Sequence, residues 1–237
     1  MKVLAWNIRH GGGKRLSRIA ASILSHAPDV IVLSEFRSVP GVELENLLAA
    51  GGYGHFHAGP LEPRKNGVAI ASRWAVVACT GSPPFEVPSH RWVEAAIPEL
   101  GITVAGFYGP LENESYMEWW NSVRTAVESR IQQPFLLAGD FNTGMSVVDA
   151  PRDPFYCSDH FYALQQLGMT DAWRFRNADA REYSWYSRRG GKDLNGFRLD
   201  HILTSPALSA RIAGATYSHD ERLAGTSDHS ALLVEFE

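Results

Sequence analysis

The chain has 237 residues, of which 45% are hydrophobic and 20% are charged. This composition is typical of a globular protein with a sizeable core, and the length favours one domain over residues 1–237. The formal net charge of −4 argues against a module that binds nucleic acid only through a general positive field.

The cysteines, the first residues and the longest apolar run together predict a cellular location. The only two cysteines, Cys79 and Cys157, provide no disulfide framework, which fits a reducing compartment. Residues 1–7 run straight into a strand pattern and leave no room for a signal peptide. The longest apolar region, residues 67–80, is interrupted by Arg73 and is too short to span a bilayer. We therefore expect a cytoplasmic protein that does not act at a membrane.

The first fifty residues alternate between strand and helix patterns. Residues 3–7 form a short strand candidate, and the apolar spacing of residues 15–26 is that of one helical face. The nearly all-apolar run 30–33 is typical of a buried strand, and Glu35 stands at its end. A second helix is predicted over residues 42–50, where two glycines follow.

The remainder of the chain is richer in strands. Helices are predicted over residues 115–131 and 159–167. The stretch between residue 167 and residue 198, which holds Trp173 and Trp185, is predicted to be mainly loop. Short strands bounded by turn residues are predicted over residues 53–57, 67–72, 75–80, 91–97, 102–107, 135–139, 199–204 and 230–236. Because strands outnumber helices and the two are mixed, we expect sheets packed together with helices outside.

The strand over residues 135–139 ends in a segment with the composition of a ligand site. Asp140 and Asn142 are two residues apart, so in an extended chain their side chains point to the same side. An acid beside an amide, flanked by glycines that allow a close approach, suits a phosphate or metal site. The same residue types also form ordinary turns, so the segment alone favours neither interpretation.

Four other predicted strands carry polar residues at one end. Because a carboxylate near a core is costly unless it is paired or bound to a metal, these residues are predicted to converge on one site. They are Asn7, Glu35, Asp200 with His201, and Asp228 with His229.

This set of side chains is typical of metal-assisted phosphoester hydrolysis. Oxygen ligands such as Glu35 and Asp228 suit Mg²⁺, with Mn²⁺ as a substitute, whereas no His/Cys cluster has the spacing of a zinc site. A histidine such as His229 can stabilise a phosphorane or move a proton when a carboxylate such as Asp200 orients it.

The order of these motifs along the chain resembles the endonuclease/exonuclease/phosphatase family, and within it the exonuclease III-type abasic-site endonucleases. The resemblance extends from Trp6 to Phe236. It rests on Asn7, Glu35, Tyr108, the run Gly139-Asp140-Phe141-Asn142, Asp200 and the run Ser227-Asp228-His229. It implies a four-layer α/β sandwich, in which two mixed β-sheets lie face to face with helices on both outer sides.

The resemblance also implies roles for individual residues. Glu35 would bind the metal, with Asn7 and Asp228 close by. Asp140 would orient or deprotonate the attacking water, assisted by Asn142. The remaining catalytic roles would fall to His229, held by Asp200 and facing the developing phosphorane, and to Tyr108, hydrogen-bonded to the phosphate.

Substrate contacts are predicted from a segment rich in aromatic and basic residues. Trp185 stands where such nucleases place a tryptophan against the abasic sugar, and Arg188 and Arg198 lie near it in the sequence. Basic residues interleaved with aromatics suit a nucleic-acid strand. Arg9 is also predicted to contact the substrate. Arg9 and Ser34 depart from the subgroup, which usually has a short acid or amide and a glutamine at these positions. Both departures fall on the wall expected to face the metal.

Three functions are compatible with the sequence. The favoured one is a Mg²⁺-dependent DNA nuclease acting at abasic sites or from 3′ ends. A phosphatase or phosphodiesterase acting on a small-molecule or lipid-headgroup phosphate is the alternative, which the modest length and negative net charge support. A non-catalytic binding domain is disfavoured, because binding alone does not need the full set of acids and His229. No obligate protein partner is inferred.

Overall fold

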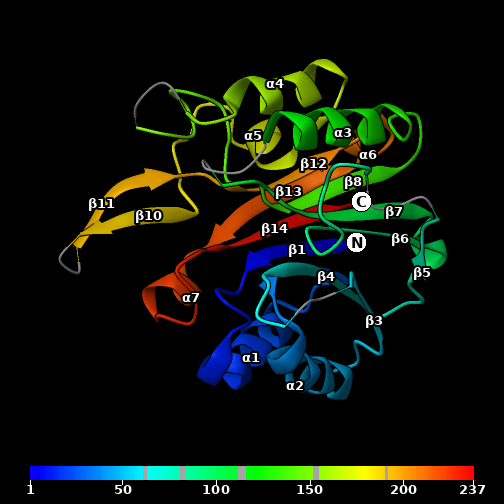
Figure 1. Ribbon diagram of the computed structural model, residues 1–237, viewed down its shortest axis with the longest axis vertical. Helices are drawn as coiled ribbons and strands as arrows, with labels where there is room; N and C mark the ends of the chain where they lie inside the picture. Colours follow the sequence, from blue (N-terminus) through cyan, green and yellow to red (C-terminus); the bar gives the residue numbers. More distant parts are fainter. Residues whose placement is uncertain (61–62, 81–83, 112–115, 152–154, 190–191) are drawn as a thin grey trace.

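The computed structural model describes residues 1–60, 63–80, 84–111, 116–151, 155–189 and 192–237. Two mixed sheets form its centre, as the family resemblance implies, and each has six strands (Figure 1). In spatial order, the first sheet contains β13 (Ile212–Ser218), β14 (Ala231–Phe236), β1 (Lys2–Asn7), β2 (Val30–Phe36), β4 (Gly67–Ser72) and β3 (His55–Ala58). The second contains β5 (Val77–Ala78), β6 (Trp92–Ile97), β7 (Ile102–Tyr108), β8 (Phe135–Asp140), β12 (Asp200–Thr204) and β9 (Thr170–Asp171).

Helices cover both outer faces of this pair of sheets, which completes the four layers (Figure 1). Helices α1 (Leu16–His26) and α2 (Ser38–Ala50) pack on the first sheet, where Ile19, Ile23 and Leu44 meet Leu4 and Leu33. Helices α3 (Tyr116–Glu128) and α4 (Ser158–Gln166) pack on the second sheet through Trp120, Val123 and Phe161. Among the residues that the structure describes, no helix is long and apolar enough to cross a membrane.

The inner faces of the two sheets form the main core. Val3, Val32 and Ile70 of the first sheet pack in one cluster with Val104 and Ala138 of the second. Strands buried on both faces have no solvent side, so β2 and β8 are nearly continuous apolar runs instead of alternating ones. This is the reason that their polar ends stand out in the sequence.

Several elements differ from the sequence-based prediction. Helix α2 begins at Ser38, four residues before the predicted start, since Pro40 is tolerated in a first helical turn. The predicted strand over residues 75–80 is only Val77–Ala78. The predicted loop before residue 199 contains α5 (Ala172–Arg176) and an antiparallel hairpin of β10 (Trp185–Arg189) and β11 (Lys192–Phe197), which projects from the sandwich (Figure 1).

Three further elements in the last quarter of the chain lack a strong sequence pattern. Strand β13 is an edge strand with small residues and a bulge between Ile212 and Gly214, so its hydrophobic alternation is weak. The helices α6 (Pro206–Ser209) and α7 (Asp220–Leu223) are single turns. Neither of these is long enough to show a helical period.

Candidate active site

The sheet topology brings the polar strand ends to one edge of the sandwich. Strands β1 and β2 are parallel, as are β7 and β8, so Asn7, Glu35, Tyr108 and Asp140 all lie at carboxyl ends. Strand β12 runs antiparallel to β8 and places Asp200 opposite Asp140. Strand β14 is antiparallel to β1, so the residues that precede it reach the same edge.

Asp140 lies at the centre of this edge and is 1% exposed. Its Oδ1 accepts a hydrogen bond from the backbone N–H of Asn142 (2.9 Å), and its Oδ2 accepts one from Asn7 Nδ2 (2.8 Å). Burial, followed by the nearby Asp200 carboxylate, raises the pKa of Asp140 to about 7. A carboxylate with this pKa can accept a proton near neutral pH.

His229 and Asp200 form a buried dyad beside Asp140. His229 Nδ1 is 2.7 Å from Asp200 Oδ2, and His229 Nε2 is 4.0 Å from Asp140 Oδ2. Burial alone would lower the pKa of His229, but the carboxylates of Asp200 and Asp140 raise it to about 10. The imidazole is therefore positively charged at neutral pH, which suits a group that faces developing negative charge.

Glu35 forms the opposite wall of the site. It sits in a bulge of β2 with a left-handed φ of 57°. Its Oε1 accepts hydrogen bonds from Asn7 Nδ2 (3.2 Å) and Tyr108 OH (3.3 Å). Burial raises the pKa of Tyr108, and the Glu35 carboxylate raises it further, so the phenol stays protonated as a donor. Asn7 thus links Glu35 to Asp140.

The donor set at this edge fits a divalent cation. Asp140 and Asp200 each offer a carboxylate oxygen, and these oxygens lie within 4.8 Å of each other; the adjacent His229 is protonated and provides charge instead of a ligand atom. Asp200 Oδ1 is buried and has no hydrogen-bond partner among the described residues, so it can accept a ligand. The ligand atoms of a second group, Asp149, Asp171 and His201, lie equally close together. The guanidinium of Arg198 already binds the two carboxylates of this group. Carboxylate oxygens such as those of Asp140 and Asp200 suit Mg²⁺ or Mn²⁺.

Of the predicted substrate residues, Arg9 and Trp185 lie beside the site. Arg9 Nε lies 3.6 Å from Asp228 Oδ2, at the rim on the Glu35 side. The partly exposed Trp185 forms an isolated β-bridge with His229, with ring centroids 6.4 Å apart. Both therefore border the site. Arg188 lies in β10, but its side chain is outside the described part of the chain.

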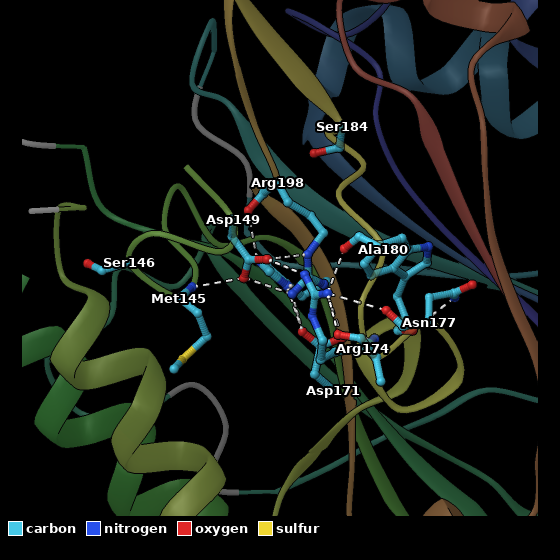
Figure 2. Close-up of polar contacts among 12 residues, drawn as sticks. Met145, Ser146, Asp149, Asp171, Arg174, Asn177, Ala180, Ser184 and Arg198 are labelled. Carbon is cyan, nitrogen blue, oxygen red and sulfur yellow. Dashed lines mark hydrogen bonds and ion pairs between the residues drawn. The ribbon is translucent and has the colours of Figure 1, made fainter. Parts of the chain in front are cut away.

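The prediction that Arg198 contacts substrate is wrong. Its side chain is completely buried, and Figure 2 shows its guanidinium between the carboxylates of Asp149 and Asp171. Arg198 Nη2 is 2.7 Å from Asp149 Oδ2 and 2.6 Å from Asp171 Oδ2, while Nε donates to Asp149 Oδ1 at 2.8 Å. The guanidinium also lies over the ring of Trp173. It is therefore part of the interior behind the site.

Two serines support the catalytic groups. Ser34 Oγ accepts the backbone N–H of Asp140 (3.0 Å), so the departure from glutamine at this position places a hydroxyl beneath the central acid. Ser184 Oγ accepts the backbone N–H groups of Leu199 (3.0 Å) and Asp200 (3.2 Å). The Ser184 carbonyl oxygen accepts the N–H of Ser230 at 2.8 Å. Ser34 stands out in the sequence only as a departure from the subgroup, and no local signal marks Ser184, because its partners are distant in the chain.

Ser184 thereby connects the two strands that carry the dyad, and its removal is expected to reduce catalysis. The Ser184→Ala substitution leaves two buried N–H groups without their acceptor, at a cost of about 1–3 kcal/mol. We expect kcat to fall more than KM rises, whereas Ser184→Thr should keep most of the activity. Steady-state kinetics with urea unfolding checks this expectation. Equal kcat values for the Ala variant and the unsubstituted protein would contradict it.

Comparisons with known proteins match this chain over nearly its whole length. A model of the endonuclease/exonuclease/phosphatase family matches residues 4–229. Exodeoxyribonuclease III of Haemophilus influenzae is 27% identical over an alignment of 274 residues that covers both chains completely. An AP endonuclease from Archaeoglobus fulgidus superimposes with a TM-score of 0.86 at 22% identity, over 100% of this chain and 99% of that one. A 3′ phosphatase from Neisseria, bound to a product DNA hairpin, gives 0.84 at 26% identity, with the same coverage.

Proposed function

The chain belongs to the endonuclease/exonuclease/phosphatase family, and we propose that within it this phosphoesterase is a Mg²⁺-dependent nuclease that hydrolyses DNA phosphodiesters, with abasic sites as its main target. The observation that carries the proposal is the buried arrangement of Asp140 between Asn7 and the His229–Asp200 dyad. The Asp140 carboxylate is a proton acceptor, and the His229 imidazolium, 4.0 Å away, is a cation. Water attack on a phosphoester requires both groups close to the phosphate.

Each residue has a chemical task in this mechanism. Asp140 orients the attacking water and takes its proton, and Asn142 fixes Asp140 through its backbone N–H. His229, held by Asp200, offers its positive charge to the phosphorane oxygens. Tyr108, whose phenol donates to Glu35 in the absence of substrate, would turn that hydrogen bond to the phosphate when substrate binds. Glu35, Asn7 and Asp228 would hold Mg²⁺, which when bound supplies charge neutralisation on the phosphate and leaving oxygen.

DNA is proposed as the substrate for two reasons. Trp185 and Arg9 border the site and provide an aromatic face and a positive charge, which suit an unstacked sugar and a phosphate backbone. The Haemophilus relative is named an exodeoxyribonuclease, and the Neisseria structure contains DNA. That second structure, a 3′ phosphatase, also supports removal of a phosphate from a DNA 3′ end as a second candidate activity.

A substrate panel tests the proposal and distinguishes these activities. The protein is incubated with MgCl₂ or EDTA and with abasic duplex, intact duplex, duplex ending in a 3′ phosphate, single-stranded DNA, RNA or a soluble phosphomonoester. We expect cleavage of the abasic duplex in Mg²⁺ and its loss in EDTA. Metal-dependent turnover of the soluble phosphomonoester alone would overturn the DNA proposal. Tight DNA binding without any turnover would favour the non-catalytic alternative.

A further inference from the structure

We propose that Arg9 competes with the divalent cation for the Asp228 carboxylate and releases this carboxylate when a DNA phosphate binds; this inference rests on the proposed function, in which Asp228 helps to hold Mg²⁺. Arg9 Nε lies 3.6 Å from Asp228 Oδ2. The carboxylate therefore already has a positive partner within the protein. A metal ion that approaches Asp228 has to share the carboxylate with this guanidinium or displace it.

The backbone of Arg9 is fixed in the wall of the site, so its side chain leaves the chain close to Asp228. Its N–H donates to Asn7 Oδ1 at 2.9 Å, and its carbonyl oxygen accepts a hydrogen bond from Arg15 Nη2 at 2.6 Å. The same Arg15 guanidinium donates to the carbonyl oxygen of Thr226, two residues before Asp228. These bonds tie the loop after β1 to the loop before β14 and keep Arg9 and Asp228 together.

The side chain of Arg9 is held much less firmly than its backbone. It is 53% exposed, and the side chain of Asp228 is 27% exposed, so water reaches both charges. Ion pairs in contact with solvent are weak, so the guanidinium exchanges partners at little cost. Arg15 differs, because its guanidinium donates to three backbone carbonyl oxygens of the two loops. Arg9 is therefore the cation of this wall that can move from a carboxylate to a phosphate, which a guanidinium binds well.

The charge of Arg9 opposes metal binding at the wall formed by Glu35 and Asp228. A guanidinium and a divalent cation that share one carboxylate repel each other, and water screens this repulsion only in part. The protein without DNA therefore binds the metal more weakly than its carboxylates alone would allow. A phosphate that draws Arg9 away from Asp228 makes the carboxylate available to the metal. DNA and metal thereby favour each other's binding.

The test compares Arg9→Met, which removes the charge, with Arg9→Lys, which keeps it. Both variants retain a Cβ at the left-handed φ of 53°, so neither changes the steric demand on the backbone. Binding of MnCl₂ is measured by isothermal titration calorimetry at low salt without DNA. We expect Arg9→Met to lower the metal Kd by roughly tenfold, because the competing charge is gone, and Arg9→Lys to stay within about threefold of the unsubstituted protein.

The second measurement is the binding of an abasic duplex in EDTA, followed by fluorescence anisotropy at several salt concentrations. We expect Arg9→Met to bind DNA more weakly, with a slope of log K against log salt that is smaller by about 1, the value for one lost phosphate contact. Tighter metal binding together with weaker DNA binding identifies an exchange of partners, whereas damage to the loop would weaken both.

The control is Arg211→Met, which removes the same charge from an exposed arginine at the end of β13 opposite to the site. It should change neither Kd by more than about twofold. An unchanged or higher metal Kd for Arg9→Met overturns the inference, and so does unchanged DNA binding. Absence of metal binding in both the unsubstituted protein and Arg9→Met would overturn the proposed function itself, so the two failures are distinguishable.

Discussion

The Asp140→Asn substitution is expected to lower kcat on an abasic duplex by roughly 10²–10⁴-fold while leaving the protein folded. Asparagine has the shape of aspartate but cannot accept the proton of the attacking water. The amide oxygen of the variant can keep one of the two hydrogen bonds that hold Asp140, the one from Asn142 N–H or the one from Asn7 Nδ2. The loss should therefore appear in kcat, with KM for DNA little changed, because the interaction is made in the transition state.

The same variant carries a prediction about stability, which follows from the pKa of about 7 for Asp140. The unfolded carboxyl ionises near pH 4. Since the folded pKa is higher than the unfolded one, ionisation destabilises the fold as pH rises from about 4 to 7. Asparagine has no such penalty. Urea midpoints should therefore favour Asp140→Asn over the unsubstituted protein at pH 8, and by less at pH 5.

Asp159→Asn provides the matched control, because this exposed aspartate lies in the first turn of α4. It should change neither kcat nor the urea midpoint by more than about 0.5 kcal/mol. An Asp140→Asn protein with normal turnover would exclude Asp140 as the group that handles the water. Loss of turnover together with a fall in stability would instead point to a structural role.

Much of this site is predictable from the sequence because strand ends obey simple rules. A strand buried on both faces is an apolar run, so an acid at its end, such as Glu35 or Asp140, is visible without an alignment. Parallel and antiparallel pairing then decides which ends meet, and the spatial order β14-β1-β2 beside β7-β8-β12 brings them to one edge. The family resemblance implied two mixed sheets face to face, whereas the strand order itself is seen only in the structure.

What the sequence does not contain is the set of partners that each polar group finds across the fold. His10 has no motif around it, yet its neighbours Glu35, Arg37 and Asn66 are brought to it by two strands and a bulge. Ser184 is one of many serines until its two N–H partners are seen. Arg198 looks like other basic residues near Trp185, and only burial separates it from them. Such contacts depend on tertiary structure and leave no periodic signal.

The Arg198→Met substitution is expected to destabilise the protein by about 3–5 kcal/mol at pH 7, because it leaves two buried carboxylates without their main cation. Methionine keeps an apolar stem but removes the guanidinium over Trp173 and its bonds to Asp149 and Asp171. Arg174, 3.0 Å from Asp149, is the nearest remaining cation among these residues. The urea midpoint and m value measure the change. Arg211→Met, at an exposed arginine bonded to a backbone oxygen of Glu237, should stay within about 0.5 kcal/mol.

Acid should reduce the effect of this substitution, and that dependence separates a buried ion pair from a substrate contact. Burial alone would raise the pKa of Asp171, but Arg198 and His201 hold it well below its usual range. The stability that this depressed pKa provides is complete above the unfolded value near 4 and is lost as pH falls below it. The difference between Arg198→Met and the unsubstituted protein should therefore shrink between about pH 5 and pH 3. An Arg198→Met protein that is as stable as the unsubstituted one but binds DNA more weakly would show that Arg198 contacts the substrate. The complete burial of Arg198 predicts the opposite result. A guanidinium held by two carboxylates has no N–H group left for a phosphate.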